Sequence, residues 1–351
     1  MIGIYLICFL VFPAVILIQV KKNEGTYVLL EKEDTNTIKG IASGFIVLIH
    51  LTNNLEADSK IIKLLMQLFS VTGGMGVLLF FFVSGYGIYK GYAHKLPDVS
   101  FLYKRLLNIY LPCLFVQFVF RLLEVWQRQS FDLKEILLES LAEAWFIYVI
   151  LIQYLIFYIS WRLAKNRQNV MIRFSFLFSL IVAAMFYLCG LNARWYNGLL
   201  LFPVGMTIAN KEAELIVIMR RKWFLNMFVY SALFVLFGGA FTYWKGSFLF
   251  ADIFKVLSGT FMSLLVCTMY TRLRLNSSIM QYVGKRSLFY YLVHLGLREV
   301  VTGFEGVDIV KTFYIVLPMT IIMVEFFYRL HDMMMRHISE RGENGKNIER
   351  Y

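Results

Sequence analysis

The recurrence of apolar runs along the chain is the feature that most constrains what it can fold into. Each run is about as long as the stretch of roughly 20 residues with which a helix crosses a bilayer. Hydrophobic residues make up 59% of the 351, and a soluble chain of this length has no core large enough to bury them. The sequence therefore predicts an all-α polytopic membrane protein, a bundle of about 10–11 transmembrane helices.

The predicted spans divide the chain into three units. An N-terminal transmembrane helix with a cytoplasmic linker is expected in residues 1–36, a membrane domain in 37–331, and a charged cytoplasmic tail in 332–351. The stretch 21–37 is expected to be an irregular linker, and Ser84 to Gly87 a place where a helix breaks or tightens. The expected spans lie near residues 1–20, 39–53, 71–88, 106–123, 143–161, 174–190, 197–210, 223–243, 253–270, 284–298 and 311–329.

Lysine and arginine alternate between loops. Most of the 35 basic residues fall in every second loop or in the C-terminal tail, and the formal net charge is +12. This asymmetry follows the positive-inside rule and predicts that these loops and the C-terminus are cytoplasmic in a multi-pass protein of the plasma (inner) membrane. No basic stripe with interleaved aromatic residues remains, so the lipid bilayer is an expected partner and nucleic acid is not.

The four cysteines lie singly inside predicted spans: Cys8, Cys113, Cys189 and Cys267. None has a neighbour at the spacing of a metal ligand pair or a disulfide framework. We expect them to be small buried groups, with no metal site in the protein.

The helix that begins near Thr37 carries a cation and an imidazole on one face. Lys39 and His50 are eleven residues apart, which at about 100° per residue places them on the same side and about 16 Å apart along the axis. Gly40 and Gly44 lie beside that face and permit close helix contact. A titratable group within a membrane span marks a functional site by default. His50 is therefore the leading candidate for a catalytic residue, acting either as a general base or through a covalent acyl-imidazole. The structural alternative is a histidine bonded across helices.

A second polar face is predicted in the stretch from Gly284 to His294. Ser287, Tyr291 and His294 follow an i, i+4, i+7 spacing, so a hydroxyl, a phenol and an imidazole share one side of a helix. We interpret His294 first as an orienting or packing group and second as another base. The pair Glu325 and Arg329, spaced i, i+4, is interpreted as structural.

Cations near one end of the bundle are candidates for binding a phosphorylated molecule. Lys39, Lys104 and Arg105 are such candidates, although ordinary positive-inside charge explains each of them as well. Near the other end, Glu143 and Trp145 suit sugar hydroxyls and sugar faces, and the alternative for Trp145 is an aromatic belt. No metalloprotease, nucleotide-binding or serine-hydrolase motif is present.

Four stretches of the chain, in this order, are similar to motifs of one known family. They are Ile38 through His50, Phe80-Phe-Phe-Val-Ser-Gly-Tyr86, Phe101 through Pro112, and Val283-Gly-Lys-Arg-Ser through His294, with a weaker match at Ala144-Trp-Phe. The chain thereby resembles the membrane acyltransferase-3 family of bacterial O-acyltransferases over about residues 37–330. Two departures are Lys39, where the family often has arginine, and Asn108, where it has the second arginine of Arg-x-x-Arg.

The resemblance implies an activity and roles for these residues. Acetyl-CoA or another acyl-CoA would be bound at the cytoplasmic side by Lys39, Lys104 and Arg105. The acyl group would pass to a hydroxyl of a cell-envelope or exported glycan or a lipid-linked sugar, without a metal. The catalytic residues would be His50, Ser84 and His294; the substrate-binding residues would be Tyr86, Glu143, Trp145, Ser287 and Tyr291.

Two other functions explain the same polar helix faces. A transporter or flippase for a lipid-linked glycan needs such faces but no thioester, and release of free coenzyme A distinguishes the enzyme from it. A non-catalytic scaffold of an envelope-synthesis complex is the third possibility. The residues do not decide between an acetyl and a succinyl group, nor do they identify the acceptor.

Overall fold

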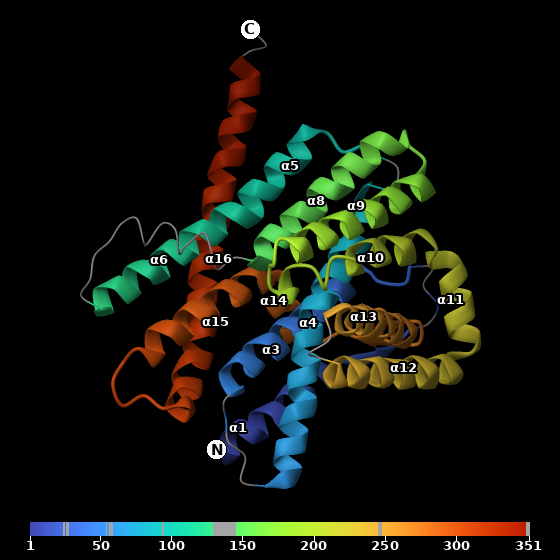
Figure 1. Ribbon diagram of the computed structural model, residues 1–351. Helices are drawn as coiled ribbons and strands as arrows, with labels where there is room; N and C mark the ends of the chain where they lie inside the picture. The colour runs from blue at the N-terminus through green and yellow to red at the C-terminus, as the bar shows by residue number, and fades with distance from the viewer. Residues whose placement is uncertain are drawn as a thin grey trace.

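The computed structural model describes residues 1–23, 25, 28–53, 55, 59–92, 95–128, 145–244 and 248–348. These residues form a helical bundle, shown in Figure 1, with one short two-stranded sheet. Six of the described helices are long and apolar enough to cross a membrane: Val99–Gln127, Trp145–Ala164, Gln168–Leu188, Trp223–Tyr243, Asp252–Tyr270 and Ile309–His337. The predicted all-α polytopic membrane fold is confirmed.

The elements follow one another as α1 (Ile2–Leu6), η1 (Ile7–Val11), α2 (Phe12–Leu17), β1 (Val20–Lys22), α3 (Lys32–Thr52), α4 (Lys60–Tyr92), α5 (Val99–Arg105), η2 (Leu106–Tyr110), α6 (Leu111–Arg128), α8 (Trp145–Ala164), α9 (Gln168–Leu188), η3 (Ala193–Trp195), α10 (Leu201–Asn210), α11 (Glu212–Arg221), α12 (Trp223–Tyr243), α13 (Phe248–Tyr270), β2 (Leu273–Leu275), α14 (Ser278–Lys285), α15 (Ser287–Thr302) and α16 (Ile309–Ile348). The last turns of α16 extend away from the bundle toward the C-terminus (Figure 1).

The segment expected as an irregular linker contains a strand and the start of α3. Val20 to Lys22 pair with Leu273 to Leu275 in antiparallel register. Helix α3 begins at Lys32 because the side chains of Glu31 and Asp34 form a capping box that satisfies backbone N–H groups at its N-terminus. Arg274 of β2 then joins the sheet to this cap, with its Nη1 2.5 Å from Asp34 Oδ2.

Two further differences concern helix length. Helix α4 begins at Lys60, well before the expected span 71–88, and runs through Ser84 to Gly87 without a break. The expected span 197–210 is instead the ten-residue helix α10, preceded by turns. Cys189 is exposed at the end of α9, whereas the other three cysteines are buried as expected.

Glycines bring the central helices into backbone contact. A Cβ atom at Gly40 of α3 would lie 1.9 Å from the carbonyl oxygen of Met280 in α14. One at Gly284 of α14 would lie 1.8 Å from the carbonyl oxygen of Asn36. A Cβ atom at Gly85 of α4 would lie 2.0 Å from the carbonyl oxygen of Phe202 in α10. Small residues at such positions allow close helix packing in membranes.

The apolar interior consists of two clusters. One is centred on α4, α8, α10 and α13, and the other on α1, α2, α3, α6, α15 and α16. Ile109 and Phe146 pack against both clusters. The polar residues described next lie on the helices where the two clusters meet.

Candidate active site

A pair of histidines joins α3 to α15. His50 lies in the last turn of α3, and His294 lies in the middle of α15 with a fully buried side chain. The Nδ1 of His50 is 2.7 Å from the Nε2 of His294, and the two rings are nearly parallel, with 12° between their planes. His50 is therefore bonded across helices, as the structural alternative from the sequence expects, and its partner is the other candidate histidine, His294.

The hydrogen bonds of this pair define which nitrogens carry protons. The Nδ1 of His294 lies 2.5 Å from the carbonyl oxygen of Tyr290, which can only accept, so this nitrogen is the donor. In neutral His294 the Nε2 is then the acceptor, and the Nδ1–H of His50 donates to it. The remaining nitrogen of His50, Nε2, keeps its lone pair, and no hydrogen-bond partner is found for it within the described residues.

A cationic side chain lies beside the same histidine. Arg298, one turn beyond His294 on α15, is 3.3 Å from the carbonyl oxygen of His50 through its Nη1. The guanidinium thereby satisfies one of the last carbonyl groups of α3, which have no partner inside the helix. The geometry holds the end of α3, and with it the His50 ring, against α15.

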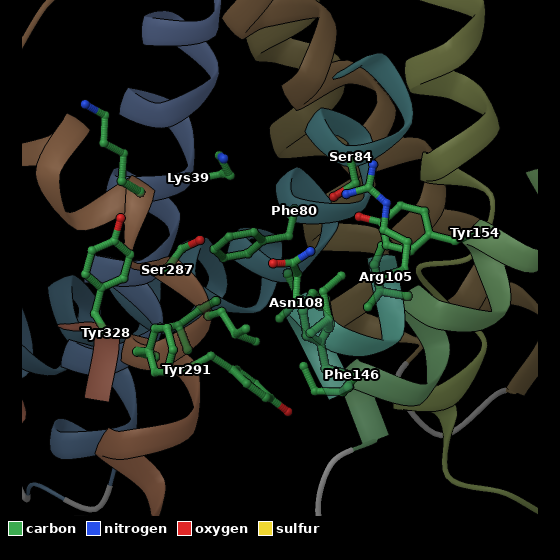
Figure 2. A pocket seen from close by; sticks show the side chains of 18 of the residues that line it. Lys39, Phe80, Ser84, Arg105, Asn108, Phe146, Tyr154, Ser287, Tyr291 and Tyr328 are labelled. Carbon is green, nitrogen blue, oxygen red and sulfur yellow. The ribbon is translucent and has the colours of Figure 1, made fainter. Parts of the chain in front are cut away.

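A cavity of about 390 Å³ lies beside the pair, between α3, α4, α5, η2, α8, α14, α15 and α16 (Figure 2). Among the described residues its lining includes four basic side chains, Lys39, Arg105, Lys285 and His331, and no carboxylate. The other lining residues are Ile46, Val77, Phe80, Ser84, Asn108, Ile109, Phe146, Ile147, Ile150, Tyr154, Ser287, Leu288, Phe289, Tyr291 and Tyr328.

Two basic side chains of the cavity, Lys39 and Arg105, have no ion pair in the described part of the chain. Lys39 is half-buried, and the charged group nearest in effect is another cation, Lys32. The guanidinium of Arg105 lies over the ring of Tyr154, 4.9 Å from its centroid, and its Nε is buried without a hydrogen-bond partner. Buried cations are normally paired, so this arrangement is suited to an anionic ligand.

The predicted polar face of α15 divides between the cavity and the histidine pair. Ser287 and Tyr291 line the cavity, whereas His294 and His50 do not. The ring of Tyr291 is 6.5 Å from that of His294, so Tyr291 lies between the two parts of the site. Figure 2 shows Ser287 and Tyr291 on one side of the cavity, facing residues of α4 and α8.

Other candidate residues are placed differently. Ser84 lines the cavity, but Lys104 is exposed and does not. Tyr86 is buried away from the cavity and donates to Glu212 Oε1 at 2.5 Å, and Lys90 pairs with the same carboxylate. Trp145 is also outside the lining, and the guanidinium of Arg194 lies 5.9 Å from its ring centroid. Glu143 lies outside the described residues.

Several residues of the site were not singled out from the sequence. Asn108 was noted only as a departure from a family motif, and Lys285 only as part of one, yet both line the cavity. His331 also lines it, near the end of the last apolar helix, and no motif marks this position. Arg298 and Glu212 are single charges on helices, and nothing in their spacing indicates their partners.

The described residues contain no group of three or more histidine, cysteine, aspartate or glutamate side chains arranged to hold a metal ion.

The ion pair that the sequence predicts between Glu325 and Arg329 is confirmed, with 2.6 Å between the two side chains. Glu325 also accepts from Arg286 at 2.8 Å, so the pair ties α16 to the start of α15.

The fold and the site together define an integral-membrane protein of many helices with an internal cavity lined by cations. A family model described as an acyltransferase domain matches residues 33–327, which is most of the chain. The chain therefore belongs to membrane acyltransferase family 3, and the resemblance noted in its motifs is confirmed. No curated protein and no solved structure matches it.

Proposed function

We propose that this acyltransferase moves a short acyl group, most simply acetyl, from cytoplasmic acyl-CoA to a hydroxyl of a cell-envelope or exported glycan. His50 is the general base. The observation that carries the proposal is the direction of the hydrogen bonds through Tyr290, His294 and His50, which leaves the Nε2 of His50 unprotonated. An imidazole in this state can take a proton from a hydroxyl and return it.

The reaction balances as a direct transfer. The Nε2 of His50 takes the hydroxyl proton while the acceptor oxygen forms a bond to the thioester carbon. The carbon–sulfur bond then breaks, and the coenzyme A thiolate takes the proton back from His50. His294 accepts the Nδ1–H of His50 throughout and so stabilises the imidazolium that forms between the two transfers.

The cavity suits the donor. Lys39, Arg105 and Lys285 bring positive charge without a lining carboxylate, and arginine offers a planar fork for phosphate oxygens. A volume of about 390 Å³ lies in the range of small-ligand sites, so it accommodates the acyl end and part of the pantetheine arm rather than the whole donor. Ser84 and Ser287 add hydroxyl groups along the cavity wall and are proposed to contact the donor.

The acceptor is proposed to approach from the opposite, outer side, near Trp145 and Glu143. The basic loops support this orientation, in which the Lys39 end of α3 is proposed to face the cytoplasm. In this arrangement residues 37–331 form the transferase domain, 1–36 an added helix and linker, and 332–351 a cytoplasmic tail. Transfer requires the side chain of Tyr291 to turn aside, because it lies between the cavity and His294.

Mass spectrometry of envelope glycans from cells with and without the protein tests this proposal. Wild type is expected to add an ester of defined mass, and purified protein to release free coenzyme A from acetyl-CoA in the presence of the glycan. His50→Ala should lose the activity by about 10²–10⁴-fold, the usual contribution of general base catalysis. His337→Ala is the matched control, since this histidine is exposed in α16 and far along the chain from the pair.

Membrane insertion of both variants is checked by detergent extraction and size-exclusion chromatography. A His50→Ala protein that acylates the glycan at the wild-type rate would show that His50 is not the base. Glycan movement across the membrane without release of coenzyme A would favour transport instead.

A further inference from the structure

The donor cavity has a polar end and an apolar end. On α3, Lys39 and Ile46 both line it and are seven residues apart, which is about 10 Å along the axis on one face. On α4 the same distance separates the apolar residue Val77 from Ser84. On α8, Phe146 lies two turns from Tyr154, whose ring carries the guanidinium of Arg105.

On all three helices the polar lining residues lie toward one end of the cavity and the apolar ones toward the other. Figure 2 shows Lys39, Ser84 and Arg105 toward one end of the cavity and Phe146 and Tyr291 toward the other. The apolar end approaches the histidine pair, because Ile46 is one turn before His50 on α3. A donor whose phosphates lie just outside the basic end therefore directs its acyl group through the cavity toward the apolar end.

Phe146 lines the apolar end. Its ring contacts Phe80, with centroids 5.9 Å apart, and Tyr291, with centroids 5.2 Å apart. Its centroid is also 5.3 Å from that of Phe81, behind the wall of the cavity. The two rings of α4, Phe80 and Phe81, hold this ring from the same helix and leave it little freedom to make room for a longer chain.

From this geometry we infer that Phe146 sets the upper length of the acyl group that the enzyme transfers. The inference rests on the proposed function and adds a specificity-determining residue to it. Phe146 contacts the end of the acyl chain, and the space between Phe80, Ile147 and Phe146 takes a short uncharged group. A terminal carboxylate, as in a succinyl group, is excluded because burying it there without a cation is costly.

Competition between donors of increasing chain length tests the inference. Purified full-length protein with a glycan fraction is given acetyl-, propionyl-, butyryl- and hexanoyl-CoA, and both coenzyme A release and the mass of the ester are measured. Phe146→Ala is expected to raise the ratio of kcat/KM for butyryl over acetyl by at least about 10-fold, because each added methylene accounts for roughly 10–200-fold in an apolar pocket.

Two further variants keep the test decisive. Phe146→Leu preserves an apolar side chain of smaller size and should shift the ratio in the same direction by less, even where the alanine variant is poorly folded. Phe115→Ala removes an aromatic ring from α6 that is 41% exposed and outside the cavity lining, and it should leave the ratio unchanged.

The outcomes separate the two proposals. Folded Phe146→Ala and Phe146→Leu proteins whose butyryl-to-acetyl ratio stays within about 2-fold of wild type would overturn the role of Phe146 while leaving the acyltransferase proposal intact. Equal use of succinyl-CoA and acetyl-CoA by wild type would overturn the exclusion of charged groups. A wild-type protein that uses no acyl-CoA at all would contradict the proposed function and remove the basis of the inference.

Discussion

His50 and His294 are separated by 244 residues along the chain, and their Nδ1 and Nε2 atoms are 2.7 Å apart. The carbonyl oxygen of Tyr290 behind His294 gives this contact a direction, since it requires a proton on the Nδ1 of His294. The pair therefore resembles a base with its orienting group, in which the second imidazole holds the first in one tautomer.

Replacing His294 tests this orienting role. His294→Asn should lower kcat by about 10²-fold or more with little change in the KM for the donor, because the Nδ1–H of His50 loses its acceptor. His294→Gln places an amide near the position of Nε2 and should retain more activity than the asparagine variant. Steady-state kinetics with acetyl-CoA measure both, and equal loss in the two variants would argue for a packing role alone.

Two adjacent basic residues are expected to differ in their effect on donor binding. Arg105→Lys keeps the charge but loses the planar fork and should weaken coenzyme A binding by about 10-fold, the equivalent of one charged hydrogen bond. Lys104→Ala is the control because Lys104 is exposed and outside the lining, so it should change affinity less than about 2-fold. Isothermal titration calorimetry with coenzyme A provides the comparison, and a larger effect at Lys104 would contradict the assignment.

Tyr86 is expected to act on stability rather than on substrate binding. Tyr86→Phe removes the hydroxyl that donates to Glu212 and accepts from the backbone N–H of Leu30, which should cost about 1–3 kcal/mol. The KM for the donor should not change. Thermal unfolding in detergent and donor kinetics test the two statements, with Tyr103→Phe, an exposed tyrosine, as control. An intact Tm with a raised KM would restore the substrate-binding role predicted from sequence.

The contact between α3 and α14 leaves no room for a methyl group. Gly40→Ala should lower stability by about 1–3 kcal/mol, because its Cβ would lie 1.9 Å from the carbonyl oxygen of Met280. Gly87→Ala on α4 adds the same atom where nothing lies within 4 Å, and a small gain is expected from better helix propensity. Tm values measured in the same detergent should therefore move in opposite directions.

The proposed orientation is tested with thiol labelling. Cys189 is the exposed one among the four cysteines, all of which are described, and it lies at the end of α9 away from the basic residues at its start. A membrane-impermeant maleimide should label Cys189 in intact cells, whereas Arg167→Cys in a Cys189→Ser background should react only after permeabilisation. The reverse pattern would invert the orientation and place the cation-lined end of the cavity outside.

The spans were predictable because hydrophobic length is a local property. Trp223–Tyr243 agrees with the expected span 223–243, and α8, α9 and α13 agree within a few residues. Helix α3 begins several residues before the helix expected from hydrophobicity, because the capping box of Glu31 and Asp34 starts it in a polar stretch. The glycines after Ser84 suggested a break in α4, but the helix is continuous there, and Gly85 serves its contact with α10.

The candidate site was predicted less completely than the fold because side chains that are close in sequence point in different directions around a helix. Ser84 and Tyr86 are two residues apart, so they point to opposite sides of α4, one to the cavity and the other to Glu212. Lys104 and Arg105 differ by about 100°, and only Arg105 reaches the cavity. A motif names such residues together, whereas the packing of the neighbouring helices separates them.

The sequence by itself determined that this protein is a helical membrane acyltransferase with conspicuous polar groups inside its spans. Apolar length, loop charge and motif order are all properties of short segments, so they survive without knowledge of the fold. The contact of His50 with His294, the cavity shared by Arg105 and Lys39, and the position of Phe146 in its lining came from the three-dimensional structure alone. These relationships depend on which faces of α3, α4, α8 and α15 meet, and that is a matter of packing between segments far apart in the chain.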